Sequence, residues 1–489
     1  MRKDECLIFS RGILTAFAKP SFLGVNRTTY MDSSIFRAYD IRGIYPAELN
    51  ESGAQKIAQG LIQLLQPKKV ALGRDARLSA PAIQGALAEA FLESGVDIVD
   101  LGMIATDMSV FAAGTLPVDL VVMVTASHNP KEWIGLKLTL KGGEPFGGEG
   151  EIQTLADEVG RSSIQHPVSS IQQGGLERRD ILGDWIKHVL SFIDPQKIRP
   201  LKVVVDAGNG VAGPIVRELF RSLPSLKLIE LFFEPDGNFP NHLPSPIEPE
   251  NTIDLGKKVV EVGADLGIAF DGDADRVFLM DERGKLVTGS EIVSLVIDEI
   301  LSEDPERIVL YNAICGWNVR DVIKKHRATA FRTKVGHGYI KKDMKKRGAF
   351  FAGEHSGHFF FKDNFNADSG LIAAVFVLQL LSKRDGPHLR QGYGGQAFSE
   401  LLKPYRKYFQ IPETNFKVGD DVQAAMNKLA EHYKEGDIDR LDGLTVTFPT
   451  WWFNVRPSSN EPLLRLNVEA VSPELLEKKK RELTDLIKL

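Results

Sequence analysis

Cysteine is almost absent from this chain of 489 residues, where it occurs only as Cys6 and Cys315. Two cysteines cannot build a disulfide framework, so we expect packing to stabilise the fold in the reducing environment of the cytoplasm. Long apolar runs are missing as well, since no stretch reaches the roughly 18 consecutive apolar residues of a membrane-spanning helix. The sequence therefore predicts neither a disulfide-rich secreted domain nor a membrane protein.

An excess of charge of one sign is also lacking. The chain has 60 Lys and Arg residues against 65 Asp and Glu residues, a formal net charge of −5. This balance argues against nucleic acid or an anionic membrane as the main partner. The composition, 43% hydrophobic and 26% charged, is that of a soluble globular protein. At roughly 150 residues per domain, the length indicates three or four domains.

The N-terminal segment is the least regular part of the sequence. It begins with basic residues, but Asp4 and Glu5 precede a short apolar stretch that Arg11 interrupts. This order is a poor match to a secretion signal. We expect residues 1–30 to be a loosely ordered extension and the folded chain to start near Met31.

A repeated pattern stands out in the rest of the chain: an apolar, β-rich run followed by a loop of Gly, Asp, Ser or Asn. It occurs in Val118–Pro130, Leu201–Gly213 and Ala264–Arg276. Helical patterns such as Ala80–Gly95 and Thr252–Ala264 accompany these runs. The combination predicts α/β units with buried, parallel or mixed sheets, in which loops beyond the carboxyl ends of the strands carry the chemistry.

Changes in composition predict the domain boundaries. The polar, Ser- and Gln-rich stretch Arg161–Gly175 indicates a boundary near residue 175, and a second is expected near residue 285, after a strand-like segment. Ser369–Lys383 is apolar on nearly every face and predicts a fully buried helix, which a Gly-rich insertion at 384–396 follows. We therefore expect α/β domains over residues 31–175, 176–285 and 286–396, and a C-terminal α+β domain over residues 397–489.

The segment "DGDADR" predicts a metal site. Asp271, Asp273 and Asp275 supply hard oxygen ligands, and Mg²⁺ is the expected ion if phosphate completes its shell. An EF-hand calcium loop needs Gly at its sixth position and helices on both sides, whereas Arg276 stands there between strand-like flanks. A solvated acidic turn is the alternative, but three clustered carboxylates repel one another unless a cation neutralises them.

A glycine pattern, Gly208-x-Gly210-x-x-Gly213, follows the strand-like run at Leu201. With Glu230 further along the chain, it formally matches a dinucleotide-binding fingerprint. A tight strand-to-helix turn explains the glycines at least as well. An oxidoreductase therefore remains an alternative that depends on this pattern alone.

Ser127 and His128 lie side by side in the turn "TASHNP", directly after an apolar run. Ser, Asn and Pro are ordinary turn residues, so one interpretation is a structural turn without a chemical role. The functional interpretation is that the strand delivers Ser127 to a cleft, where it acts as a nucleophile.

The segment "GEHSGH" carries Glu354, Ser356 and His358 on a Gly-framed loop. A carboxylate and a hydroxyl on such a loop suit the recognition of sugar hydroxyls, whereas the order of residues is wrong for a zinc motif. A polar surface turn is the alternative.

The turn "RPSSNEP" (Arg456–Pro462) combines a guanidinium, two hydroxyls and an amide between two strand-like segments. This set can bind an anion such as a phosphate, although a plain hairpin turn has the same residues. Four more arginines lie near strand-like segments, where they are either solvated or manage phosphate charge: Arg37, Arg42, Arg74 and Arg77.

Together, these motifs resemble those of the α-D-phosphohexomutase family, in particular its bacterial and archaeal phosphomannomutase/phosphoglucomutase group. The matching stretches are "FRAYDIRG" (Phe36–Gly43), "TASHNP", "DGDADR", "GEHSGH" and the "RPSSNEP" turn, so the likeness extends from about Met31 to the C-terminus. The resemblance implies three related α/β domains with mixed sheets and a C-terminal α+β domain around a central active-site cleft.

The resemblance also implies roles for single residues. Ser127 would carry the phosphoryl group, and Asp271, Asp273 and Asp275 would hold Mg²⁺ against that phosphoserine. Lys137 would act as general base or acid if nearby cations lower its pKa. His128, Arg42 and Arg276 would lie beside it. The implied substrate-binding residues are Tyr39, Gly336, His337, Glu354, Ser356, His358, Arg456, Ser458, Ser459 and Asn460.

The implied activity is reversible phosphoryl transfer between the 1- and 6-positions of mannose or glucose phosphates, with a hexose 1,6-bisphosphate as intermediate and activator. Phosphoglucosamine mutase is the alternative within the family, although its phosphate loop usually contains a Ser-Gly-Thr that this chain lacks. A Mg²⁺-dependent sugar phosphatase and a non-enzymatic sugar-phosphate sensor are alternatives outside it.

Two departures from the family pattern leave the sugar preference open. Ser459 and Asn460 replace an Asn-Thr pair of the phosphate loop, and Ile314 stands where relatives often carry a basic residue. Overall we expect a cytoplasmic monomer or weak dimer that binds hexose phosphates.

Overall fold

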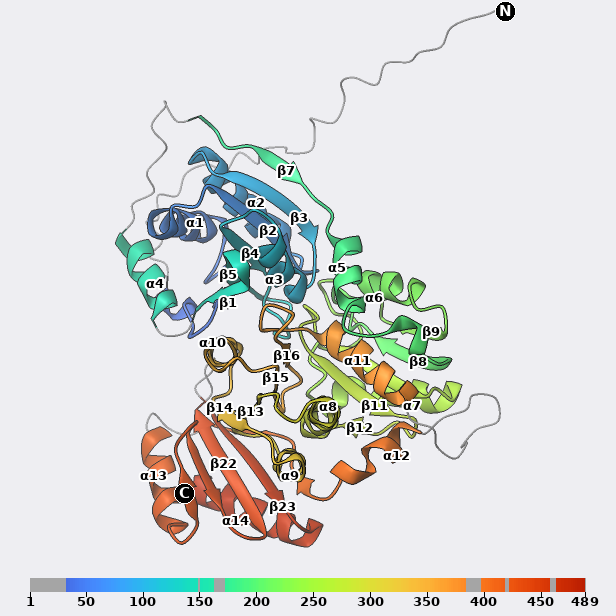
Figure 1. The fold of residues 1–489 in the computed structure, drawn as a ribbon. Coiled ribbons are helices and arrows are strands. Elements are labelled where there is room, and N and C mark those ends of the chain that lie inside the picture. The colour runs from blue at the N-terminus through green and yellow to red at the C-terminus, as the bar shows by residue number, and fades with distance from the viewer. Residues whose placement is uncertain are drawn as a thin grey trace, which may run out of the picture.

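The computed structural model describes residues 32–147, 150–161, 172–383, 397–417, 422–457 and 463–488. The expected N-terminal extension, the Gly-rich insertion 384–396 and the three predicted phosphate ligands Ser458, Ser459 and Asn460 lie outside the described residues. Figure 1 shows four sheet-bearing regions, from the first (blue) through the second and third (green and yellow) to the fourth (red).

The first region is a mixed seven-stranded sheet between helices. Its strands are β1 (Ile41–Ile44), β2 (Lys69–Arg74), β3 (Asp97–Met103), β4 (Leu120–Val124), β5 (Trp133–Leu140), β6 (Glu144–Phe146) and β7 (Leu176–Arg178). Their order is β1-β5-β4-β2-β3-β7, with β6 paired to β5, and β2 is parallel to both β3 and β4. The helices are α1 (Glu51–Leu65), α2 (Ala80–Glu93), α3 (Thr106–Thr115) and α4 (Glu151–Arg161).

Both faces of this sheet are covered, which explains the unbroken apolar run of β4. Val122 and Val124 join one hydrophobic core with α1, α2 and α4. The alternating residues Val121 and Met123 join a different core, which includes residues of α3. Because successive side chains of a strand point to opposite faces, a strand covered on both sides must be apolar throughout.

The second and third regions repeat this architecture with five-stranded sheets. The second has the order β12-β11-β10-β8-β9, and the third has the order β14-β13-β15-β16-β17. The strands of the second sheet are β8 (Leu201–Asp206), β9 (Leu226–Leu231), β10 (Leu266–Phe270), β11 (Val277–Asp281) and β12 (Leu286–Val287), with helices α5 (Leu182–Leu190), α6 (Ala212–Arg221) and α7 (Ile253–Val262). Those of the third are β13 (Val309–Asn312), β14 (Ala330–Thr333), β15 (Phe351–Gly353), β16 (Phe359–Phe361) and β17 (Ala367–Asp368), with helices α8 (Gly289–Glu303), α9 (Trp317–His326), α10 (His337–Arg347) and α11 (Gly370–Lys383).

The fourth region has a different fold, an antiparallel sheet with helices. Its strands are β18 (Phe409–Gln410), β19 (Thr414–Phe416), β20 (Asp437–Asp439), β21 (Leu444–Thr447), β22 (Trp451–Pro457) and β23 (Leu464–Ala470), and its helices are α13 (Val422–His432) and α14 (Pro473–Lys488). Helix α12 (Phe398–Leu402) lies after the predicted boundary at residue 396, but it packs into a hydrophobic core of the preceding regions and not into that of the fourth. The order is β18-β23-β22-β21-β20, with β19 also paired to β23. Short 3₁₀ helices elsewhere cover Ser33–Ile35, Lys141–Gly143, Pro195–Lys197, Pro249–Thr252 and Lys403–Tyr405.

Two sheets extend beyond the predicted boundaries. β7 lies after residue 175 but pairs in parallel with β3, so the first sheet continues to Arg178. β12 lies after residue 285 but pairs with β11, so the second sheet continues to Val287. Both strands are short, which gives them too little hydrophobic pattern to predict from the sequence.

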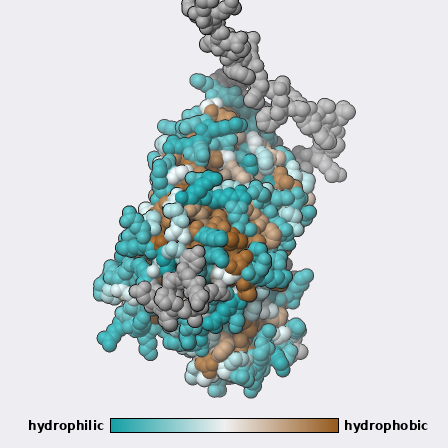
Figure 2. Space-filling model, turned by 90° about the vertical axis from the view of Figure 1, so that its right-hand side faces the viewer, coloured by the Kyte–Doolittle hydropathy of each residue, from teal (hydrophilic) through white to brown (hydrophobic). Residues whose placement is uncertain are grey.

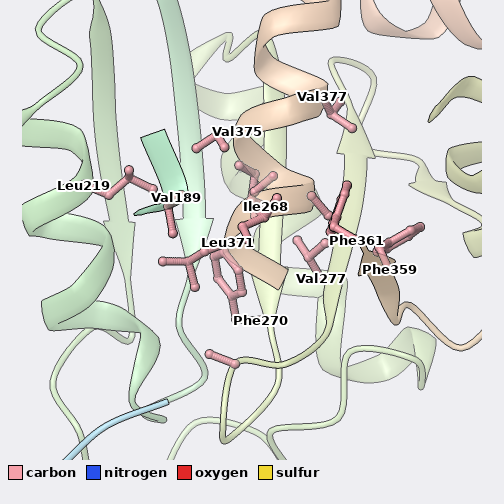
Figure 3. Packing of buried hydrophobic residues seen from close by; sticks show 14 of the residues in the cluster. Val189, Leu219, Ile268, Phe270, Val277, Phe359, Phe361, Leu371, Val375 and Val377 are labelled. Atoms are coloured by element: carbon pink, nitrogen blue, oxygen red, sulfur yellow. The ribbon is translucent and has the colours of Figure 1, made fainter. Parts of the chain in front are cut away.

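Helix α11 connects the second and third regions. Its residues are buried along most of its length, and it contacts α5, α8 and β11. Figure 3 shows Leu371, Val375 and Val377 of this helix among Ile268 and Phe361, which come from the second and third sheets. The predicted buried helix is therefore confirmed, because it packs between two sheets rather than on a surface.

The surface agrees with the balanced composition. Figure 2 shows mostly hydrophilic residues on the visible face, with apolar residues in small groups. No helix in the described part of the chain has both the length and the apolarity needed to cross a bilayer.

Candidate active site

The Ser127 loop begins where β4 ends and places the serine hydroxyl against the second region. Ser127 adopts a left-handed conformation with φ of 51°, and its N–H donates to Thr125 Oγ1 over 2.8 Å. Its hydroxyl donates to Asp271 Oδ2 over 3.1 Å and lies 3.1 Å from His128 Nδ1. A non-glycine residue with positive φ is uncommon and persists only where its surroundings fix it, as at many functional sites.

The acidic loop is the turn of a β-hairpin. Phe270 of β10 pairs with Val277 of β11, and the six residues Asp271–Arg276 connect them. The three aspartates of this loop are at most 3% exposed and can place one oxygen each within 4.8 Å of one another. Helices do not flank the loop, which confirms the rejection of an EF-hand.

The orientation of the carboxylates fits a cation. The Oδ1 atoms of Asp273 and Asp275 are buried without a hydrogen-bond partner among the described residues, whereas their Oδ2 atoms are engaged. Burial raises the pKa of Asp271 to about 7, and Lys137 helps to hold the pKa of Asp275 at about 2 despite its burial. Buried, unpaired carboxylate oxygens are costly, and a divalent cation with oxygen preference removes that cost. The donor set therefore suits Mg²⁺.

Lys137 lies on β5, where it pairs with Met123 of β4 close to the Ser127 loop. Its Nζ atom is 2.8 Å from Asp273 Oδ2 and 2.6 Å from Asp275 Oδ2. Burial alone would lower the pKa of Lys137, but the two carboxylates outweigh it and raise the pKa. The expected lowering by nearby cations is therefore wrong for this arrangement, because the nearest charges are anionic.

Three other predicted residues surround the serine. Arg42 binds Asp40 and donates to Asn129 Oδ1 over 2.6 Å. Arg276 donates from Nε to Asp271 Oδ2 over 2.8 Å, and its buried Nη2 has no partner among the described residues. Burial and nearby cations lower the pKa of His128 well below its usual value, so this imidazole is neutral.

The sugar-recognition candidates come from the third region. Glu354 Oε1 accepts from Gly336 N over 3.1 Å, and its Oε2 atom lies 3.1 Å from His358 Nδ1. The His358 Nε2 atom lies 3.7 Å from Asp275 Oδ1, so this histidine faces the acidic loop. Despite burial, these carboxylates raise the pKa of His358.

One cavity of about 460 Å³ brings the candidates together. Residues of all four regions line it. They include all the predicted catalytic residues and those predicted substrate-binding residues that the structure describes. These are Tyr39, Arg42, Ser127, His128, Lys137, Arg276, Gly336, His337, Glu354, Ser356, His358 and Arg456. The aspartates lie behind this wall, in contact with Ser127 and Lys137.

The sequence interpretation missed two residues of the cavity, Glu413 and Arg465. Arg465 lies directly opposite Arg456 in the β22–β23 pair, so the two guanidinium groups share one face of the hairpin. Glu413 accepts from Arg456 Nη2 over 2.9 Å and from Arg465 Nη1 over 3.0 Å. The sequence offered one signal for Arg465, because Arg456 and Arg465 stand on the two strand-like segments that flank the turn.

The glycine pattern after β8 does not form a dinucleotide site. A Cβ on Gly210 would lie 2.6 Å from the Gly272 carbonyl oxygen, and one on Gly213 would lie 2.0 Å from the Phe233 oxygen. The acidic candidate Glu230 instead pairs with Arg217. Gly210 allows close packing of the backbone against the acidic loop, and Gly213 allows it against Phe233, so the oxidoreductase alternative loses its support.

Comparison with known sequences identifies the family. Models of the phosphoglucomutase/phosphomannomutase family match consecutive parts of the chain: α/β/α domain I at 33–162, domain II at 183–284, domain III at 288–408 and the C-terminal domain at 413–486. The chain belongs to this family. The expected family, fold class and phosphohexose mutase activity are thereby confirmed.

Individual relatives agree with this membership. A phosphomannomutase of Escherichia coli K12 is 36% identical over 445 residues, which cover 89% of this chain and 94% of the relative. A phosphomannomutase of Vibrio cholerae is 37% identical over 470 residues, covering 93% and 98%. The solved structure of a phosphoglucomutase/phosphomannomutase family protein of Burkholderia thailandensis aligns with a TM-score of 0.82 and 33% identity, covering 94% of this chain and 98% of that one.

Proposed function

We propose that this phosphohexose mutase moves the phosphoryl group by way of Ser127, between the 1- and 6-positions of a hexose phosphate. The observation that carries the proposal is the contact of Ser127 Oγ with Asp271 Oδ2, inside a cavity lined by several cationic side chains. A phosphoserine at this position has its charge surrounded by groups that stabilise the transferring phosphoryl group.

The acidic loop is proposed to hold Mg²⁺ through Asp271, Asp273 and Asp275, with the phosphoserine as a further ligand. The unpartnered Oδ1 atoms of Asp273 and Asp275 support this assignment. The ion would supply neutralisation of the phosphoryl oxygens. Arg276 lines the same cavity, and its buried Nη2 has no hydrogen-bond partner among its described contacts.

The chemistry requires two transfers of opposite direction. In the first, a hydroxyl of the hexose monophosphate attacks the phosphorus of the phosphoserine, and the bond to Ser127 Oγ breaks. The sugar hydroxyl proton passes to a base, and the serine oxygen takes up a proton. The product is a hexose 1,6-bisphosphate, which turns so that its other phosphate returns to Ser127 and a monophosphate leaves. One solved relative, an N-acetylphosphoglucosamine mutase of Aspergillus fumigatus with a serine replaced by alanine, contains glucose 1,6-bisphosphate.

Two residues are candidates for the base. His128 is neutral and adjoins Ser127 Oγ, so it can accept a proton as it stands. Lys137 is charged while it pairs with Asp273 and Asp275, and becomes a base only where those carboxylates have another cationic partner.

The end of the cavity that the fourth region lines is proposed to bind the phosphate that does not react. Arg456 and Arg465 both face the cavity from one hairpin, and guanidinium groups bind phosphate in a forked geometry. Glu354 and Ser356, which line the cavity from the third region, suit the sugar hydroxyls. Because the bisphosphate turns, this end must accept either phosphate, which suits arginines better than a rigid pocket.

The experiment follows mannose 1-phosphate and glucose 1-phosphate by ³¹P NMR, with Mg²⁺ and a trace of the matching 1,6-bisphosphate. We expect conversion to the 6-phosphate by the wild type and by Ser222→Ala, an exposed serine on another loop, but not by Ser127→Ala. Intact mass should show a removable phosphoryl group on the wild type and none on Ser127→Ala. Release of inorganic phosphate without isomerisation would instead indicate a phosphatase, and preference for glucosamine phosphate would indicate the phosphoglucosamine mutase alternative.

A further inference from the structure

Arg77 is a buried arginine outside the catalytic cavity. It follows β2 in the segment "GRDAR" and is 1% exposed. The sequence left open whether this arginine is solvated or manages phosphate charge. It does neither, because it is buried and does not belong to the described residues that line the cavity.

The guanidinium of Arg77 is occupied by the backbone of the Ser127 loop. It donates to four carbonyl oxygens: from Nη2 to Ser127 and Asn129, both over 2.7 Å, and from Nη1 to Pro130 over 2.7 Å and Trp133 over 3.0 Å. The first three carbonyls belong to the segment between β4 and β5, and Trp133 is the first residue of β5. One side chain thus binds both ends and the middle of the turn.

The Ser127 carbonyl is confined from two sides. Arg77 Nη2 lies on one side, and the acidic loop lies on the other, where a Cβ on Gly272 would be only 2.7 Å from this oxygen. Ser127 has a φ of 51°, a left-handed conformation that is strained for a non-glycine residue and persists only where its surroundings fix it. Fixing the carbonyl also fixes the side-chain direction that brings Oγ to Asp271.

Arg77 is itself held rigidly. Its Nε donates to Asp75 Oδ2 over 3.1 Å, and its own backbone N–H donates to Asp75 Oδ1 over 2.9 Å. The ring of Phe239, from the second region, lies 5.3 Å from the guanidinium carbon. Gly237 of the same segment packs so closely that a Cβ there would be 2.8 Å from Arg77 Cα. The loop with the serine and the domain with the acidic loop therefore meet at this arginine.

We propose that Arg77 is a positioning residue for phosphoryl transfer, which holds the Ser127 loop so that the serine oxygen faces the acidic loop. This role rests on the proposed function of Ser127. A lysine cannot replace it, because an ammonium group presents its donors at one point, whereas the planar guanidinium reaches four carbonyls at once. Misplacement of a reacting group by about 1 Å can reduce a rate by roughly 100-fold.

The test compares Arg77→Lys and Arg77→Ala with Arg74→Lys, a matched control on β2. Arg74 is half-buried and contacts the carbonyl of Asp75 but none of the four carbonyls that Arg77 binds. We expect kcat to fall by about 10- to 100-fold in both Arg77 variants, while KM for hexose phosphate and stabilisation by Mg²⁺ stay near wild type. Millimolar methylguanidinium should restore part of the lost kcat in Arg77→Ala, where the side chain leaves a buried cavity, and not in Arg77→Lys.

Hydrogen exchange gives a readout that needs no turnover. We expect peptides covering residues 125–133 to exchange faster in the Arg77 variants and to remain unchanged in Arg74→Lys. A wild-type kcat in Arg77→Lys, or a loss of kcat matched by weaker substrate binding and unchanged exchange, would overturn the proposal. If the wild type transferred no phosphoryl group through Ser127, the proposed function would fail, whereas the exchange data would still show whether Arg77 orders the loop.

Discussion

At the scale of single residues, Asp273 of the acidic loop accepts hydrogen bonds from hydroxyl groups of the first region. Thr106, the first residue of α3, donates from Oγ1 to Asp273 Oδ2 over 2.6 Å, and its backbone N–H donates to the Asp273 carbonyl over 2.9 Å. Thr125 adds a longer bond of 3.3 Å to the same carboxylate oxygen. These contacts engage one oxygen of Asp273 and leave Oδ1 without a hydrogen bond among the described residues, where the proposed Mg²⁺ would bind.

We predict that Thr106→Val weakens Mg²⁺ binding by about 10- to 100-fold, the usual effect of removing a group that orients a metal ligand. The substitution preserves the shape of the side chain but removes the donor to Asp273 Oδ2. Calorimetric titration with Mg²⁺ measures the affinity directly. Thr115→Val is the matched control, since this exposed threonine ends the same helix and donates only to Phe111 O among its described contacts. Equal affinities in the two variants would show that Thr106 does not orient Asp273.

The sequence predicted candidate residues whose own chemistry is conspicuous, but it did not predict the roles of residues that act through others. Local clusters of polar residues in the sequence indicate Ser127, the three aspartates and Glu354. Thr106 and Arg77 make their decisive contacts with residues 50 or more positions away, and Arg77 binds backbone carbonyls. A partner far along the chain leaves no local pattern, and a backbone partner leaves no residue-type signature, so neither role has a local signal.

At the scale of elements, the N-terminus of α9 joins the third and fourth regions. Glu469 of β23 accepts from Trp317 N over 2.8 Å, at the first residue of α9, and from Trp452 Nε1 over 2.9 Å. Burial raises the pKa of Glu469 to about 7, although the two N–H donors oppose the shift. The folded protein therefore prefers the neutral acid at this contact.

The raised pKa of Glu469 has a definite sign for stability. Its usual pKa is 4.5, so the contact contributes fully below that pH, and the contribution is lost as the pH rises through about 7. We predict that the melting temperature of the wild type falls relative to that of Glu469→Gln between about pH 5 and pH 8, because glutamine keeps the acceptor and does not ionise. Scanning calorimetry of both proteins in matched buffers measures the difference between their melting temperatures. The effects of the other titrating groups cancel in this difference. A difference independent of pH would contradict the prediction.

Elements were easier to predict where the chain is apolar over a long run. The strands before the three functional loops appear as β4, β8 and β10, and the expected helices appear as α2 and α7. The edges of the sheets were harder to predict, because β7 and β12 are stabilised by pairing with distant strands. A pairing partner far along the chain is invisible to a local hydrophobic pattern.

At the scale of the whole molecule, the boundaries between the hydrophobic cores do not coincide with the boundaries between the four sheets. One large core includes residues of the first, second and third regions, among them Met123, Phe270 and Leu371. The fourth region has its own core, with Leu483 of α14. Described contacts between the third and fourth regions include polar ones, namely the Glu469 contact and the ion pair of Arg332 with Asp439. A shared core couples domains strongly, whereas such polar contacts couple them weakly.

We therefore predict two calorimetric transitions rather than four, one for the first three regions together and one for the fourth. Leu371→Ala and Leu483→Ala are matched substitutions, since both leucines are fully buried. Each should cost about 2–5 kcal/mol by leaving a cavity. We expect Leu371→Ala to lower the midpoint of the larger transition only and Leu483→Ala that of the smaller one only. A single transition that both substitutions lower equally would show instead that the fourth region unfolds together with the rest, and that the Glu469 contact couples the two units as strongly as a shared core does.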